Sequence, residues 1–197
     1  MEYLIKQYPL EKGALEIQYI EEFFGEFPRK KTAQEIMDRL EGREYLILMA
    51  EAALPDDPGM TAPVSFKVVH ELKADEREPK LRDLVDRLRE SVTFEDRKIL
   101  YSWIGGTRSD WRGQGHFRAL TEESEAWAHA VGFHEVVVKT KNKFYDMRGT
   151  LDHLEFDVVK YEVNARDNRE SKVYLSKRLT SDVVRSHRSL RTVVHAH

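Results

Sequence analysis

Six consecutive residues, Arg-Gly-Gln-Gly-His-Phe at positions 112–117, carry the clearest chemical signal in this sequence. Gly113 and Gly115 allow the backbone to turn tightly and to come within hydrogen-bonding distance of a ligand. Apolar residues at helical spacing follow from Phe117 onward, so the turn stands at the start of a predicted helix. The first amides of a helix are unpaired and lie at the positive end of its dipole. The turn is therefore predicted to bind phosphate or pyrophosphate.

Two well-known phosphate loops do not fit this turn. A Walker loop requires Gly-Lys-Ser/Thr after four spacer residues, and no such run occurs. The dinucleotide fingerprint requires a third glycine, but Arg118 stands at that place after Gly113 and Gly115. A different phosphate-bearing cofactor is implied.

A strand and a long helix are predicted to position this turn. Residues 99–104 form a mostly apolar run of strand length, which Gly105 and Gly106 are expected to end. The helix is expected to close at Gly132, where a C-terminal glycine belongs. Its apolar stripe consists of Phe117, Leu120, Trp127 and Val131, with Ser124 in the same row. Three acidic residues are expected to face largely away from this stripe: Glu122, Glu123 and Glu125.

The turn resembles the pyrophosphate-binding motif of the GCN5-related N-acetyltransferases, R-x-x-G-x-G/A between a strand and a helix. The first five places are occupied by Arg112, Gly113, Gln114, Gly115 and His116. The sixth place departs from the pattern, because it holds Phe117 instead of a small residue. The resemblance implies that the loop amides and these six residues hold the pyrophosphate of acetyl-coenzyme A.

Two further matches follow in the order of that family. Asn142 comes after the predicted fifth strand, and Leu154-Glu155-Phe156 stands where Leu-Gly-Phe is usual. The resemblance implies the α/β (α+β) acetyltransferase fold, with a mixed, mostly antiparallel sheet of six or seven strands flanked by helices. It implies one domain over residues 1–179 with a helical insertion at about 73–97. Residues 180–197 are expected to form a tail or an appended helix.

Composition limits the class of protein. A chain of 197 residues with 41% hydrophobic and 34% charged residues suits one soluble domain with a sizeable core. Its longest apolar run, 45–50, is too short to cross a bilayer, and no signal sequence opens the chain. The net charge of −3 gives no general attraction to nucleic acid or to an anionic membrane. We therefore expect a cytoplasmic protein without nucleic-acid or membrane partners.

The rest of the chain is predicted to alternate between helices and strands. A first strand is expected within 1–9, and a helix is expected around Ile17, Ile20, Phe24 and Phe27. A second helix starts at Thr32 with Glu35 three places on, a capping box. The remaining predicted strands are 44–50, 64–70, 134–140, 157–163 and 172–179, with a turn-rich loop at 55–63 and a short helix from Asn142 to about His153.

Catalytic roles follow only from the resemblance. Backbone N–H groups near Ile104, Gly106 and Thr107 are expected to contact the cofactor and to polarise the thioester carbonyl. Family members often place a catalytic Glu on the fourth strand, but residues 98–107 contain no carboxylate, so Glu71 is the nearest substitute. The family's thiolate-protonating Tyr falls at Leu151, which leaves Tyr145 as the expected acid and Tyr101 as a weaker option.

The implied activity is acetyl-CoA-dependent transfer to a primary amine by direct attack, since the chain has no cysteine to carry an acetyl group. The alternative is a non-catalytic acyl-CoA-binding sensor or regulatory module. The acidic pairs Glu21-Glu22 and Asp56-Asp57 favour a cationic acceptor, and a homodimer is a family-level expectation. Neither a histidine pair with zinc-binding spacing nor a G-x-S-x-G elbow occurs, so no metal site and no serine hydrolase is predicted.

Overall fold

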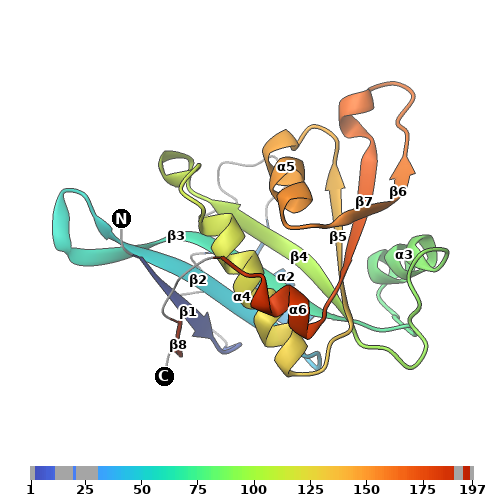
Figure 1. Cartoon of the computed structure of the whole chain (residues 1–197), viewed down its shortest axis with the longest axis horizontal. Coiled ribbons are helices and arrows are strands. Elements are labelled where there is room, and N and C mark those ends of the chain that lie inside the picture. The colour runs from blue at the N-terminus through green and yellow to red at the C-terminus, as the bar shows by residue number, and fades with distance from the viewer. Residues whose placement is uncertain (1–2, 12–19, 21–30, 189–192, 196–197) are drawn as a thin grey trace. The chain divides into compact units, whose positions relative to one another are not determined.

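The computed structural model describes residues 3–11, 20, 31–188 and 193–195 (Figure 1). The chain divides into two compact units. Unit 1 comprises Met1–His70, Ile104–Ser124 and Arg188–His197, and unit 2 comprises Glu71–Trp103 and Glu125–His187. The strand before the glycine turn (99–107) and the helix after it (116–130) are each divided between the two units. Residues 99–103 and 125–130 belong to unit 2, and residues 104–107 and 116–124 belong to unit 1. Each unit is described below by itself.

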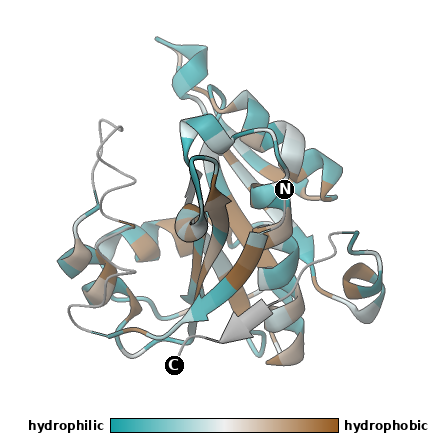
Figure 2. Cartoon of the chain, turned by 90° about the vertical axis from the view of Figure 1, so that its left-hand side faces the viewer, coloured by the Kyte–Doolittle hydropathy of each residue, from teal (hydrophilic) through white to brown (hydrophobic). Residues whose placement is uncertain are grey.

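Unit 1 is built on β1 (Tyr3–Tyr8), β2 (Tyr45–Leu54) and β3 (Asp57–Leu72). β1 pairs with β2 and β2 pairs with β3, both antiparallel. A short strand, β8 (Val193–His195), pairs parallel with the outer edge of β1. β2 is buried along most of its length, which matches its continuous apolar run, and Figure 2 shows apolar residues gathered in the strands.

The hairpin between β2 and β3 is longer than its sequence predicts. The expected loop at 55–63 is wrong, because β3 already begins at Asp57 and the turn is confined to residues 55–56. The pairing is irregular between Ala50 and Glu51 and again between Ala53 and Leu54. Such bulges allow an exposed strand pair to continue through residues that favour turns.

Helix α2 (Ala33–Leu40) precedes β2 and confirms the N-cap half of the predicted capping box. The Thr32 hydroxyl accepts a hydrogen bond from the amide of Glu35 at 3.2 Å, which satisfies one of the unpaired amides at the helix start. Ile36 and Leu40 form its buried face. Of the helix predicted around Ile17, only Ile20 is described, and it is buried. The rest of that helix lies outside the described residues.

Unit 2 contains the beginning of β4 (Ile99–Thr107) together with β5 (Glu135–Lys141), β7 (Lys172–Arg178) and β6 (Asp157–Glu162). β4 and β5 are parallel over three residue pairs, from Ile99↔Glu135 to Tyr101↔Val137. β7 is antiparallel to both β5 and β6. A 3-10 turn, η3 (Asn168–Glu170), lies between β6 and β7.

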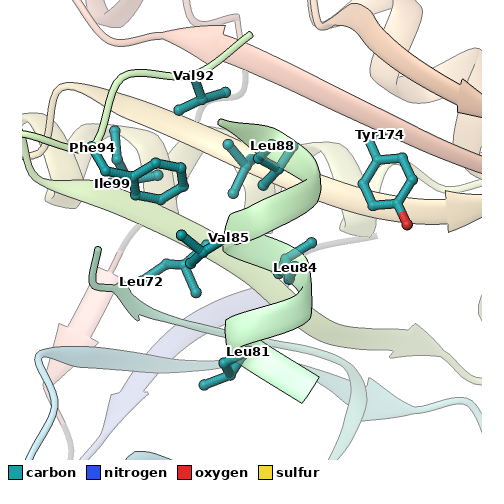
Figure 3. Packing of buried hydrophobic residues seen from close by; sticks show 10 residues of the cluster. Leu72, Leu81, Leu84, Val85, Leu88, Val92, Phe94, Ile99 and Tyr174 are labelled. Carbon is teal, nitrogen blue, oxygen red and sulfur yellow. The ribbon is translucent and has the colours of Figure 1, made fainter. Parts of the chain in front are cut away.

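The helix of the predicted insertion is present as α3 (Pro79–Leu88). Its apolar face packs into a buried cluster that also contains Ile99, Val137 and Tyr174 from three strands (Figure 3). The helical members of this cluster are Leu81, Leu84, Val85 and Leu88. The charged residues between these positions therefore belong to a helix whose apolar face is part of the core of unit 2.

Three more helices complete the described chain: α4 (His116–Ala130), α5 (Tyr145–His153) and α6 (Ser181–Arg185). α4 ends as predicted at Gly132, whose φ of +94° is the left-handed conformation that glycine adopts without strain. The prediction that all three glutamates of α4 face away is wrong. Glu122 is 1% exposed and Glu125 is 0% exposed.

One local and two long-range partners explain the burial of these two carboxylates. In unit 1, Glu122 accepts a hydrogen bond from Arg118 at 3.1 Å. In unit 2, the Glu125 carboxylate lies 2.6 Å from the Lys177 ammonium of β7 and 3.2 Å from the His187 ring, which follows α6. Burial of a carboxylate is costly unless a cation compensates it, and Lys177 is itself only 7% exposed.

The expected fold class is confirmed. The strands form a mixed, mostly antiparallel arrangement with flanking helices. The described residues contain the seven strands of the expected fold, and β8 adds a short eighth at the edge of unit 1. None of the helices in the described part of the chain is long and apolar enough to cross a membrane.

Candidate functional site: a glycine turn at the start of a helix

The turn before α4 has the backbone that its glycines predict. Gly113 and Gly115 have φ values of +76° and +84°, in the left-handed region that other residues enter only with strain. A methyl group built on either glycine would meet no atom within 4 Å. The turn therefore presents its backbone to open space, as a ligand-binding loop requires.

The amides that follow this turn are the first of α4. The earliest helical hydrogen bond in this region runs from the Ala119 amide to the Gly115 carbonyl at 3.0 Å. The amides of His116, Phe117 and Arg118 come before that bond and have no carbonyl one turn earlier in the helix. Helix starts of this kind, with unpaired amides at the positive end of the dipole, are suited to binding an anion.

Arg112 is exposed at the beginning of the turn, and its Nε donates to the Thr107 carbonyl at 3.3 Å. This bond ties the arginine stem to the end of β4 and leaves the two terminal nitrogens of its guanidinium for a ligand. The structure therefore brings Thr107 and Arg112 together within unit 1. Gln114 is exposed in the same turn.

The end of β4 corrects one expectation. Gly105 and Gly106 do not end the strand, which continues to Thr107. A Cβ on Gly105 would lie 3.2 Å from the Phe66 carbonyl, and one on Gly106 would lie 3.1 Å from the Phe66 ring, so close packing accounts for both glycines. Ser65 on β3 donates to the Gly106 carbonyl at 3.0 Å and lies 2.8 Å from the Thr107 hydroxyl.

His116, the first residue of α4, is buried at 3% exposure. Its ring meets Tyr3 of β1 edge to face at 4.5 Å between centroids, and Trp111 at 6.1 Å. Burial lowers the pKa of His116 below its ordinary value of 6.5, although a hydrogen bond with the Trp111 backbone opposes this effect. The residue was identified from the motif, but its burial depends on β1 and has no signal in the local sequence.

The lowered pKa of His116 predicts a pH-dependent stability. Below pH 6.5 the unfolded chain binds a proton at this position more readily than the folded chain, so the free energy of unfolding falls on acidification. His116→Gln should reduce the fall in Tm between pH 7 and pH 5.5. His153→Gln, which removes an exposed histidine of α5, serves as the control. An unchanged slope in His116→Gln would contradict the prediction.

Phe117 occupies the place where the motif has a small residue, and its ring lies on one side of the turn. The Lys67 ammonium of β3 stands 4.9 Å from the ring centroid, within cation–π range. Lys67 is 4% exposed, so the pair is part of the packing of unit 1.

The other expected residues belong to unit 2. Asn142 follows β5 and uses its whole amide there: the nitrogen donates to the Tyr161 hydroxyl and the Asn168 carbonyl, and the oxygen accepts from Arg148. These bonds tie the end of β5 to the β6–β7 connection. Tyr145 begins α5 and is 63% exposed.

Comparison with solved structures shows what the chain is similar to. Arabidopsis thaliana NAA60 in complex with a bisubstrate analogue matches with a TM-score of 0.68 at 12% identity, covering 89% of this chain and 99% of that one. A chain of the NatC complex bound to Gag peptide and CoA matches with a TM-score of 0.66 at 14% identity, covering 91% and 100%. The Escherichia coli ribosomal-protein-S18-alanine N-acetyltransferase matches with a TM-score of 0.60 at 14% identity, covering 91% and 95%.

The chain has the fold of the GCN5-related N-acetyltransferases. No family model and no curated protein matches its sequence, so the acetyltransferase fold is recognised here through structure. Arabidopsis NAA60 with acetyl-CoA is among the matches, at a TM-score of 0.67 and 12% identity.

Two features of the acetyltransferase fold take unusual residues in this chain. Leu151 stands at the place where the family resemblance implies the thiolate-protonating Tyr. Its side chain is 1% exposed and packs inside unit 2. Glu155, at the place of the usual glycine, has a φ of +64°. The backbone therefore keeps the left-handed turn after α5 although a larger residue occupies it, at a cost of about 1–2 kcal/mol.

Glu71 lies near the end of β3, with its carboxylate 3.7 Å from the Lys73 ammonium. Its side chain is 20% exposed. Among the described residues, no group of three or more His, Asp or Glu side chains is arranged to hold a metal ion. The chemistry available from the described turn is thus anion binding by backbone amides beside an arginine.

Proposed function

We propose that this protein is an acetyl-CoA-dependent N-acetyltransferase that acts on a primary amine by direct attack. The observation that carries the proposal is the turn at 112–117, where two left-handed glycines open the backbone immediately before α4. The neighbouring folds support it, because those solved with acetyl-CoA or CoA include NAA60 and NatC.

Bound acetyl-CoA would supply a thioester for attack by the amine. The amides at the start of α4 and the Arg112 guanidinium would hold its pyrophosphate, and the backbone near Ile104, Gly106 and Thr107 would polarise the acetyl carbonyl. As the amine nitrogen bonds to the acetyl carbon, the carbon–sulfur bond breaks. We assign the proton leaving the amine to Glu71 and the proton reaching the departing thiolate to Tyr145.

Cofactor binding is tested by thermal unfolding with acetyl-CoA. At about a hundred times its dissociation constant, the ligand should stabilise the fold by about 2.7 kcal/mol. For a chain of this size the rise in Tm is about 5–10 °C. The same experiment without ligand is the reference, and absence of a shift would contradict acetyl-CoA binding.

Turnover distinguishes the enzyme from the alternative, an acyl-CoA-binding sensor. Two observations favour the sensor: Leu151 is buried where an acid is expected, and β4 carries no carboxylate. Release of free thiol in the presence of a panel of primary amines is the measurement. A Tm shift without thiol release over that panel would support the sensor.

Tyr145→Phe is expected to slow acetyl transfer at least about tenfold while leaving acetyl-CoA affinity nearly unchanged, because only the proton donor is removed. Tyr45→Phe is the matched control. The Tyr45 hydroxyl accepts a hydrogen bond from the Leu10 amide at 2.7 Å in unit 1, so its loss should affect stability instead of rate. An unchanged rate in Tyr145→Phe would remove this tyrosine from the mechanism.

A further inference from the structure

A second site is indicated on the face of unit 2 that α3 covers. Tyr174 of β7 belongs to the buried cluster under α3 (Figure 3). The register places Lys139 of β5 directly opposite Tyr174, so both side chains lie on the same face of the sheet. Lys172 precedes Tyr174 by two residues on β7 and therefore shares that face as well.

The acidic residues beside α3 are already engaged. Asp83 of α3 lies 2.8 Å from the Nε of Arg87 on the same helix. Glu162 of β6 accepts a hydrogen bond from the Tyr174 hydroxyl at 2.5 Å and a second one from Arg87. Partial burial opposes ionisation of Glu162, but these partners hold the pKa of its carboxyl below the usual range.

A second acid, Glu170, is also neutralised by its neighbours. Lys141 and Lys143 both donate to its carboxylate, and they lower the pKa of Glu170 to about 2. Lys139 and Lys172 are different. Within the part of the chain that the structure describes, neither ammonium has a carboxylate within 4.0 Å.

The two lysines therefore concentrate positive charge on this face. The Lys139 ammonium lies 5.9 Å from the Tyr174 ring centroid, while the residue remains exposed to solvent. Partial burial lowers the pKa of Lys139, and the charge of Lys172 lowers it further. Asp83 and Glu162 oppose this effect, but Asp83 is already engaged by Arg87 and Glu162 by Tyr174, so an oxyanion would add a counter-charge to the two lysines.

We propose that Lys139 and Lys172 form a binding site for an oxyanion group, a carboxylate or a phosphate, carried by a ligand. Two ammonium groups at neighbouring strands can each donate a charge-assisted hydrogen bond to such a group. The adjacent Tyr174 and Arg87 are held by Glu162 and keep the surrounding face fixed. This site stands independently of acetyl transfer, because neither lysine has a role in the proposed transfer.

The experiment titrates the full chain with inorganic phosphate and, separately, with succinate at low ionic strength. Binding is followed by calorimetry and by the NMR signals of the lysine side chains. Lys139→Gln and Lys172→Gln should each weaken binding about tenfold or more. Lys80→Gln removes an exposed lysine of α3 and should leave the affinity unchanged. Binding of phosphate alone would show that the site prefers a phosphate group, and binding of succinate alone would show that it prefers a carboxylate.

Phosphate is also expected to bind at the glycine turn, so Arg112→Gln is included. Anion binding that persists in Arg112→Gln and disappears in Lys139→Gln supports the lysine site, whatever the fate of acetyl-CoA binding. Binding that is lost in Arg112→Gln and kept in both lysine variants would overturn it, as would failure of both anions to bind. The ligand-free Tm controls for folding: Lys139→Gln should melt close to wild type, because Lys139 is exposed to solvent and its substitution removes both repulsions and attractions.

Discussion

Replacing Glu125 by glutamine is expected to lower the free energy of unfolding by about 3–5 kcal/mol, because it leaves the Lys177 charge buried without its partner. The two groups lie 2.6 Å apart at 0% and 7% side-chain exposure. Glutamine keeps the shape of the side chain, so the loss reports charge and not packing. Urea unfolding followed by circular dichroism is the measurement.

Two further variants make the interpretation specific. The double variant Glu125→Leu with Lys177→Met should be clearly more stable than Glu125→Gln, because neither charge then remains buried. Glu95→Gln breaks an ion pair with Arg89 whose partners are 41% and 66% exposed, and it should cost little stability because solvent screens exposed ion pairs. A loss in Glu125→Gln as small as that of Glu95→Gln would show that Lys177 is well hydrated in solution.

The second large effect is expected at the glycine turn. Gly115→Ala should weaken acetyl-CoA binding about 10- to 100-fold, because its methyl group would enter the open space beside the amides that are proposed to hold the pyrophosphate. The left-handed φ adds a loss of stability of about 1–2 kcal/mol. Calorimetric titration of acetyl-CoA measures the first effect, and urea unfolding measures the second.

Gly132→Ala is the matched control, since Gly132 also has a positive φ and no neighbour within 4 Å of an added Cβ. It ends α4 instead of beginning it, so its substitution should cost similar stability and leave acetyl-CoA affinity unchanged. Equal affinity losses in the two variants would mean that backbone strain, and not the turn, controls binding.

Local signals in the sequence predicted the parts of the fold that local interactions determine. Thr32 and Glu35 begin α2, and Gly132 ends α4, through hydrogen bonds and dihedral angles within a few residues. The two glycines of the turn were predictable for the same reason. Their φ values are properties of the turn itself.

The errors occurred where distant residues decide the outcome. The helical pattern predicts Glu125 to be a surface residue. It is buried instead, because its partner Lys177 comes from β7. Gly105 and Gly106 predict the end of a strand, but β4 continues past them. Small residues are required there because Phe66 on β3 packs closely against them. The charged face at Lys139 and Lys172 could not be predicted locally either, because the pairing of β5 with β7 places the two lysines at diagonal positions of one face.

The pairing of β8 with β1 has a consequence for biosynthesis. β1 is made shortly before its partner β2, whereas the strand that pairs with its other edge in the described part of the chain, Val193–His195, is made much later. At ordinary translation rates, on the order of ten seconds pass between these events. During this interval the nascent chain presents an unpaired strand edge, the type of surface on which chains associate with one another. β8 thus protects the edge of a strand that is made long before it.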